Sequence, residues 1–422
     1  MLGIGAGVLA LCCGAALGQV QEKIDAAFAL QKDGATLAVV RAALANEAGD
    51  EAVQFAIASV DFLMAGEGLL QAAHRHGFLS TLAPVSGMVG RRDILAWIFN
   101  GQPAPTTFAD IDAAVQGFVD ALGRCEAQLG DVGDFKCAIN VPQVRFDVNS
   151  DGKAEEKEAI GALLGALPGR WEYDAKEERY VEVPLLPEEF TIAFDHGDAS
   201  WLRGYCHLLM GVGQVWLAHD GQEWFDRTGL VLFPDAQIRY DFLKNSTFFI
   251  EAMGDRTPTP FDVTDLIAMI GNFEMPVDEP ERMKAALEHF RATVVHGKEM
   301  WGRYDAETDD DREWIPNPGQ HAGVIGVEVD AEMREAWLMF LDECDDLLAG
   351  RKVLRFWRGD GSKGIDLVKV FEEPREFDLL YWIQGSAAAP YLKAGQFTSD
   401  GTWERLLDVF DERVFRFSFW FN

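Results

Sequence analysis

The clearest chemistry in the sequence lies in an acidic stretch between Asp147 and Glu158, which reads D-V-N-S-D-G-K-A-E-E-K-E. Oxygen-bearing side chains stand at its first, third, fifth, ninth and twelfth positions, and glycine stands at the sixth. Calcium takes about six to eight oxygen ligands, and a loop with this spacing aims its oxygens at one centre. The sequence therefore predicts a single calcium site in this segment.

Six residues of the loop are predicted calcium ligands: Asp147, Asn149, Asp151, Lys153, Glu155 and Glu158. Lys153 contributes its backbone carbonyl, Glu155 binds directly or through water, and Glu158 closes the loop as a bidentate ligand. Gly152 permits the sharp bend, because glycine tolerates a positive φ. On these residues the loop resembles the EF-hand family, and the resemblance implies Ca²⁺ as the cofactor.

The residues around the loop predict one flanking helix. Pro142 cannot sit inside a regular incoming helix, whereas residues 155–167 carry apolar side chains at helical spacing. Paired EF-hand loops have Ile, Leu or Val at position eight, where this loop has Ala154, and the sequence contains no second complete loop. We expect weak binding, at about 10⁻⁴ to 10⁻³ M, with calcium acting as a static brace. An acidic turn that binds no ion is the alternative.

The N-terminal residues predict export. Residues 1–21 contain no charged side chain, and Leu2 begins an apolar run that ends in the small-x-small pattern from Ala16 to Gly18. Cleavage after Gly18 would release a chain that begins at Gln19. Because the run is shorter than the span of about 20 residues that a membrane needs, we expect no stable membrane insertion. The expected location is the periplasm or the extracellular space, and a buried first helix is the alternative.

Export would permit disulfides among the four later cysteines, which are Cys125, Cys137, Cys206 and Cys344. Cys125 and Cys137 are the predicted pair, because their bridge would close the short segment ahead of the calcium loop. Cys206 and Cys344 lie on the apolar faces of two helical patterns. For these two residues, buried thiols and a bridge between helices both remain open.

Composition excludes some classes of partner. The formal net charge is −32, with 69 acidic and 37 basic residues, which argues against nucleic acid and against anionic membrane surfaces. The hydrophobic content of 48%, with 12 Trp and 29 Phe, is enough for large buried cores. We therefore expect a globular protein.

The hydrophobic patterns predict a mainly α, α+β fold in four regions: a signal peptide at 1–18, a helical region at 19–140, an EF-hand-like calcium unit at 141–170 and a larger α+β domain at 171–422. Helices are predicted at 24–44, 52–74, 108–125 after the capping pair Thr107 and Asp110, 201–217 after Asp198, and after Asp278 and Asp330. Strands are predicted at 180–183 and 190–194, which could form a hairpin, and at 353–357, 365–371 and 415–421.

A second acidic segment surrounds Arg312 with six carboxylates: Asp305, Glu307, Asp309, Asp310, Asp311 and Glu313. Carboxylates this close can hold a metal or shift one another's pKa values for acid-base catalysis. A solvated acidic loop is the simpler interpretation. Trp314 and the residues that follow it indicate an ordered surface beside the segment.

The expected function is that of a secreted or periplasmic calcium-binding protein with a binding or envelope-associated role. The sequence does not identify its protein or glycan partner. The alternative is a secreted hydrolase that uses the acidic residues at 305–313. The sequence contains no Walker loop, dinucleotide fingerprint, G-x-S-x-G or H-E-x-x-H motif, so whether the protein is an enzyme stays open.

Overall fold

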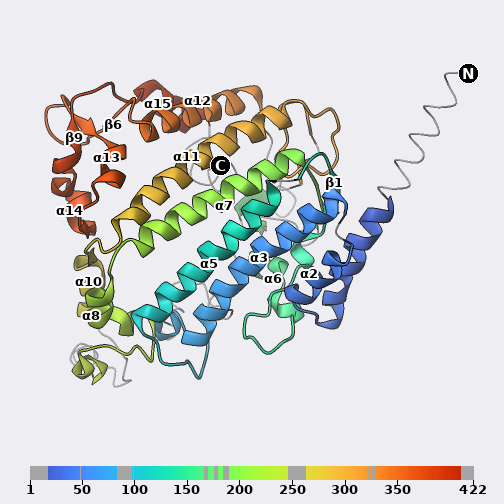
Figure 1. The fold of residues 1–422 in the computed structure, drawn as a ribbon, viewed down its shortest axis with the longest axis horizontal. Coiled ribbons are helices and arrows are strands. Elements are labelled where there is room, and N and C mark those ends of the chain that lie inside the picture. The colour runs from blue at the N-terminus through green and yellow to red at the C-terminus, as the bar shows by residue number, and fades with distance from the viewer. Residues whose placement is uncertain are drawn as a thin grey trace, which may run out of the picture. The chain divides into compact units, whose positions relative to one another are not determined.

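The computed structural model describes residues 18–47, 49–82, 97, 99–130, 132–165, 170–174, 179–183, 190–245, 263–321, 323–324 and 329–409. Residues 1–17 of the predicted signal peptide and the predicted strand at 415–421 lie outside this set. The described residues form a mainly α fold with small β-sheets, which confirms the predicted fold class (Figure 1).

The chain divides into two units, each assembled from separate stretches. Unit 1 contains residues 1–67, 121–206 and 296–334, and unit 2 contains residues 68–120, 207–295 and 335–422. Several long helices contribute one part of their length to each unit.

Unit 1 begins with a helical hairpin in place of the continuous helix predicted at 24–44. Residues 18–29 are helical and lead into the 3-10 turn η1 (Leu30–Asp33), after which α2 covers Leu37–Ala45. The prediction was wrong because Gly34 adopts a φ of 85° and its amide caps the end of η1. The third helix, α3 (Glu51–His76), confirms the prediction at 52–74.

Two small sheets belong to unit 1. Strand β1 (Lys136–Ile139) pairs antiparallel with β4 (Ile192–Asp195), and β2 (Arg170–Asp174) pairs antiparallel with β3 (Arg179–Val183). The two strands predicted near these positions are present, but the hairpin between them is wrong. Each strand finds its partner elsewhere, because pairing depends on tertiary contacts that the alternation of residue types does not specify.

In the predicted calcium unit, the outgoing helix differs from the prediction at its start. The 3-10 turn η4 (Val141–Gln143) precedes the loop, with Pro142 in its first turn. After the loop come the 3-10 turn η5 (Glu156–Glu158) and α6 (Ile160–Gly165). The outgoing helix therefore begins later than predicted.

Four long helices confirm their predicted positions: α5 (Phe108–Leu129), α7 (His196–Leu217), α11 (Pro280–Tyr304) and α12 (Ala331–Leu348). The predicted capping pair of α5 is present, because Thr107 N donates to Asp110 Oδ2 at 2.8 Å and Asp110 N donates to Thr107 Oγ1 at 3.2 Å. The cap predicted for α7 at Asp198 is wrong. That helix starts earlier, where Gly197 N donates to Asp195 Oδ1 at 2.7 Å.

The remaining elements lie in unit 2 and are short. The helices and turns are η2 (Ser80–Leu82), α8 (Gln222–Leu232), η6 (Asp241–Asn245), α10 (Val263–Gly271), α13 (Leu367–Glu372), α14 (Leu379–Gln384), η7 (Ser386–Tyr391) and α15 (Asp400–Val409). The strands are β5 (Glu274–Met275), which pairs with β8 (Phe377–Asp378), and β6 (Leu354–Arg355), β7 (Gly364–Ile365) and β9 (Leu392–Lys393), which form one sheet. The strand predicted at 365–371 is wrong beyond Ile365, because Asp366 caps α13.

Helix α3 is long and apolar enough to cross a membrane by length and composition. In its most apolar window, 44% of the residues are buried inside the protein. Core helices of soluble proteins meet the same criteria, so this observation is weak evidence for a membrane span.

The predicted disulfide between Cys125 and Cys137 is not formed, and no disulfide joins the cysteines that the structure describes. Cys137 lies on β1 opposite Phe194. Cys125 lies on α5, where its Sγ donates to the Ala58 carbonyl at 3.2 Å and accepts from Cys206 Sγ at 3.7 Å. The prediction was wrong because it used distance along the chain, whereas the helices bring Cys206 to Cys125.

Candidate functional site

The first three predicted side-chain ligands are folded back over the loop by hydrogen bonds to its backbone. Asp147 accepts from Asp151 N through Oδ1 and from Gly152 N through Oδ2, both at 3.0 Å. Asn149 Oδ1 accepts from Asp151 N at 3.0 Å, and Asp151 Oδ1 accepts from Lys153 N at 2.9 Å. Each of these three side chains thereby has an oxygen bonded to an amide further along the same turn.

Gly152 meets the conformational requirement of the sixth position. Its φ is 85°, a region that L-residues with side chains rarely adopt. An added Cβ would meet no atom within 4 Å. Backbone conformation, and not lack of space, therefore requires glycine here.

Glu158 closes the loop and is 5% exposed. Its Oε1 accepts from Val148 N at 3.1 Å and its Oε2 accepts from Glu155 N at 2.9 Å. A carboxylate has about four acceptor positions, so these two bonds leave lone pairs that a cation can use. The donor set, which consists of hard oxygens, fits calcium.

A β-bridge replaces the incoming helix at the base of the loop. Arg145 and Ala159 form an isolated antiparallel bridge, and Phe146 N donates to Glu158 O at 3.0 Å. Pro142 lies just before this bridge, where a helix would need the amide that proline lacks. The two ends of the loop are therefore held together by backbone hydrogen bonds.

The turn of the N-terminal hairpin contacts the loop at its eighth position. Ala154 is completely buried, and its N–H donates to the Gly34 carbonyl at 3.1 Å. Nearby, Gln31 Nε2 donates to Arg145 O at 2.7 Å, and Arg145 N donates to Gln31 Oε1 at 3.0 Å. The backbone at this position of the loop is therefore paired with the turn of the hairpin.

Glu67 of α3 adds a carboxylate that the sequence did not identify. It is 7% exposed, and its Oε1 accepts from Asp147 N at 2.7 Å. Burial raises the pKa of Glu67 to about 7, an effect that the Asp147 amide opposes and the Asp147 and Glu158 carboxylates reinforce. The available signal was an acidic residue within an apolar helical pattern.

The other predicted ligands are open to solvent. Asn149, Asp151, Lys153 and Glu155 are exposed. In the part of the chain that the structure describes, no three of the loop's carboxylates lie within 4.8 Å of one another. Calcium binding would therefore have to draw these side chains together.

A cavity of about 770 Å³ lies beside the calcium unit. Phe28 and Gln31 of the hairpin line one part of it, and Arg145, Glu156 and Ala159 of the calcium unit line another. This volume falls in the range of about 300 to 1,000 Å³ that is typical of small-molecule sites. The base of the loop thus forms part of a cavity wall.

In the second acidic segment, four of the six carboxylates have basic or imidazole neighbours. Asp309 and Asp311 pair with Lys136, Asp305 pairs with Arg334, and Asp310 Oδ2 lies 3.6 Å from His321 Nδ1. The hydrogen bond from Lys136 lowers the pKa of Asp309. These side chains form a charged outer face.

Glu307 and Glu313 instead meet Asp195, a residue that the sequence did not associate with them. One oxygen of each side chain lies within 4.8 Å of the others, and Glu313 is 5% exposed. Burial raises the pKa of Glu307 to about 9 and that of Glu313 to about 7, and the Asp195 carboxylate adds to both effects. These three carboxyl groups are called the inner acidic cluster below.

Asp198 and Tyr304 support the inner acidic cluster. Asp198 is 3% exposed and accepts from Tyr304 OH at 2.7 Å and from Asp195 N at 2.9 Å. A Cβ on Gly197 would lie 2.5 Å from Tyr304 Cδ1, so the first turn of α7 can approach this ring because residue 197 is glycine. Burial raises the pKa of Asp198.

The inner acidic cluster can do one of two things chemically. Close carboxyl groups in a buried setting can retain protons at neutral pH, as the pKa of Glu307 near 9 indicates. Alternatively, one oxygen from each of three carboxylates can coordinate a divalent cation. Both uses reduce the repulsion between the carboxylates.

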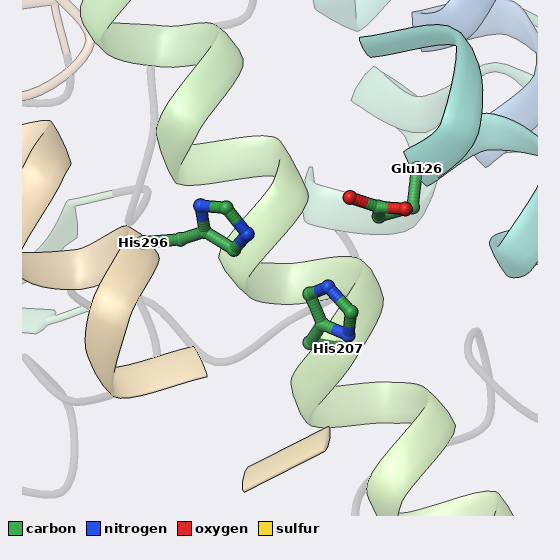
Figure 2. A group of neighbouring side chains, drawn as sticks. All are labelled: Glu126, His207 and His296. Atoms are coloured by element: carbon green, nitrogen blue, oxygen red, sulfur yellow. The ribbon is translucent and has the colours of Figure 1, made fainter. Parts of the chain in front are cut away.

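Figure 2 shows Glu126 on α5, His207 on α7 and His296 on α11. In unit 1, Arg203 donates to Glu126 Oε1 from Nε at 3.0 Å and from Nη2 at 2.7 Å, and His296 Nδ1 lies 2.9 Å from Glu299 Oε2. In unit 2, His207 Nδ1 lies 3.0 Å from a ring nitrogen of His289. Each group has a polar neighbour in its own unit, as expected for histidines that stabilise a core.

Comparisons with protein-family models, with curated proteins and with solved structures gave no match for this chain.

Proposed function

We propose that the protein is an exported calcium-binding protein in which the ion braces unit 1. The hydrogen bonds within the loop carry the proposal, because they tie the oxygens of Asp147, Asn149 and Asp151 to the amides of one turn. Glu158 closes the same turn from the far end. An ion bound there would replace repulsion between these carboxylates with attraction to a common centre.

The brace would act on the contacts that join the loop to the hairpin and to α3. Ala154 meets Gly34, and Asp147 meets Glu67. The adjoining cavity supports a binding role, since calcium would stiffen the part of its wall formed by Arg145 and Glu156. The charge-free residues at 1–21 support export to the periplasm or beyond.

Thermal and urea unfolding of the full chain, with EDTA or with 10 mM calcium, tests the proposal. A ligand that binds the native state stabilises it by RT ln(1 + [L]/Kd), or about 1.4 to 2.7 kcal/mol for a Kd of about 10⁻³ to 10⁻⁴ M. We expect the double variant Asp147→Asn, Glu158→Gln to lose this response. These substitutions keep oxygen acceptors for the backbone amides while removing two negative charges.

Glu156→Gln is the matched control. It removes an exposed charge from the same loop at a position that supplies no predicted ligand, so its calcium response should equal that of the unaltered chain. An unaltered chain that melts at the same temperature in EDTA and in calcium would contradict the proposed site. A double variant that keeps the full response would place the ion elsewhere.

The inner acidic cluster favours a second candidate, a secreted hydrolase. A carboxyl group that stays protonated near neutral pH can act as a general acid, as the raised pKa values of Glu307 and Glu313 would allow. Assays against chromogenic glycosides and peptides test this candidate. An activity that Glu313→Gln abolishes and the solvent-facing change Asp309→Asn preserves would support it, whereas loss in both variants or in neither would count against it.

A further inference from the structure

Two buried thiols of unit 1 lie in contact although the sequence separates them by 81 residues. Cys125 on α5 and Cys206 on α7 both have no exposed surface, and their Sγ atoms are 3.7 Å apart. Cys206 donates to Cys125, which in turn donates to the carbonyl of Ala58. Among the described residues of unit 1, a third cysteine, Cys137, lies on β1.

We propose that Cys125 and Cys206 are a redox-active pair that forms a disulfide linking α5 to α7 within unit 1. The S–S distance in a disulfide is about 2.05 Å, so the two sulfurs must approach by less than about 2 Å. Rotation of the two side chains with a small shift of the helices covers such a distance. Formation of this disulfide does not depend on calcium binding.

The oxidant belongs to the class of small disulfides, of which oxidised glutathione is one. One cysteine thiolate attacks the small disulfide RSSR, which forms a mixed disulfide and releases one RS⁻. The second thiolate then attacks the mixed disulfide, forms the Cys125–Cys206 bond and releases the second RS⁻. The two protons lost by the cysteines protonate the two RS⁻ groups. In the net reaction, two thiols are oxidised and one small disulfide is reduced to two thiols.

Burial determines when the reaction can occur. The thiolate is the attacking species, and the contact with Cys125 together with burial raises the pKa of Cys206. An oxidant also cannot reach side chains without exposed surface. The bond should therefore form during folding, before α5 and α7 are packed together, or while the two helices are transiently apart. In the folded protein it should form slowly.

Formation of the disulfide breaks few contacts of the surrounding structure. Cys125 gives up the hydrogen bond to the Ala58 carbonyl, but residue 58 lies inside α3, where the helix supplies a backbone donor to that carbonyl. The covalent link also restricts the unfolded chain across the 81-residue separation. Such restriction stabilises the folded state relative to the unfolded ensemble.

The test is refolding of the reduced full chain in a buffer of reduced and oxidised glutathione. Samples are quenched in acid, denatured, alkylated and digested, and disulfide-linked peptides are identified by mass spectrometry. We expect a peptide pair that contains Cys125 and Cys206 and is two hydrogens lighter than the sum of its reduced parts. The oxidised chain should melt several degrees higher than the reduced chain.

Cys137→Ala is the control variant, because it removes a buried thiol of the same unit and should leave the peptide pair unchanged. The double variant Cys125→Ala, Cys206→Ala should show no difference in melting temperature between the two redox conditions. Recovery of both cysteines in alkylated form from the refolded chain would overturn the proposal. So would a bond from either of them to Cys137. Both of these outcomes are read from the unaltered chain, so they do not depend on how well a variant folds.

Discussion

The calcium loop and the segment at 305–313 are both acidic, and both belong to unit 1, yet their carboxylates behave differently. In the loop, Asp147 and Glu158 accept hydrogen bonds from backbone amides of the loop itself. In the second segment, Glu307 and Glu313 turn toward Asp195, while Asp309 turns toward Lys136. Similar composition thus produces one site whose oxygens are tied to amides and another whose carboxyl groups crowd together.

The difference shows that backbone register decides what an acidic segment can do. Amides at intervals of two to five residues along the loop donate to its side-chain oxygens and hold them over one turn, which suits cation binding. In the inner acidic cluster, burial and neighbouring carboxylates raise pKa values, which suits retention of protons. Counting acidic residues does not distinguish the two cases.

Substitution of two glycines tests the comparison and has the largest expected effect on stability. Gly197→Ala should destabilise the fold by about 2 to 3 kcal/mol, because its Cβ would overlap the Tyr304 ring. Gly152→Ala should cost about 1 kcal/mol, through backbone strain alone. Urea unfolding measures both values. Calcium should stabilise the Gly197 variant normally and the Gly152 variant less, and equal calcium responses would show that the loop conformation does not control binding.

The pH dependence of stability tests the inner acidic cluster. Because folding raises the pKa of Glu307 from 4.5 to about 9, the folded state holds this proton more tightly. The resulting stabilisation is complete below about pH 4.5 and is lost as the pH rises toward 9. Glu307→Gln should remove this loss of stability at high pH. At pH 8.5 the free energy of unfolding of the variant should exceed that of the unaltered chain by about 1 to 2 kcal/mol, a value reduced because Glu307 is partly exposed.

Asp309→Asn, in the same segment, tests a contribution to stability with the opposite pH dependence. The pKa of Asp309 is lowered in the folded state, so its contribution is present above its ordinary pKa and is lost as the pH falls. Urea unfolding in EDTA between pH 3 and pH 9 measures both variants. If Glu307→Gln and the unaltered chain lose stability in parallel above neutral pH, Glu307 does not retain its proton.

Glu67→Gln sharpens the comparison from the side of the loop, with the smallest expected effect. The glutamine keeps an oxygen acceptor for Asp147 N but removes a negative charge beside the calcium loop. We expect calcium affinity at pH 8 to fall roughly two- to fivefold, or about 0.5 to 1 kcal/mol, in calorimetric titrations. An unchanged affinity would restrict Glu67 to a structural role.

Local signals predicted much of the fold. Thr107 and Asp110 marked the start of α5, and Asp330 marked the start of α12, where it accepts from Met333 N at 2.8 Å. The loop was identifiable because oxygen-bearing residues at fixed spacing surround Gly152. These features depend on residues within about one turn of each other, which is the range over which sequence patterns report structure.

The missed residues depend on contacts between distant segments. Glu67 reaches Asp147 across 80 residues, and Asp195 meets Glu307 from a different part of the chain. The predicted disulfide partner of Cys125 was Cys137, the next cysteine along the chain, whereas Cys206 is the cysteine that contacts Cys125 in the structure. No local periodicity encodes such contacts, because they arise only when segments distant in the sequence come together in the folded chain.

The hydrogen bonds between Gln31 and Arg145 also bear on how the protein folds. They join residues 114 positions apart. The polar contacts of the N-terminal hairpin therefore form only after residues around Arg145 have reached it. Contacts between distant residues slow folding, because chain entropy is lost before the contacts compensate for it. An ion that orders the loop early would present Arg145 and Ala154 in their final positions. The calcium concentration that a newly made chain meets would then set how quickly its first fifty residues become ordered.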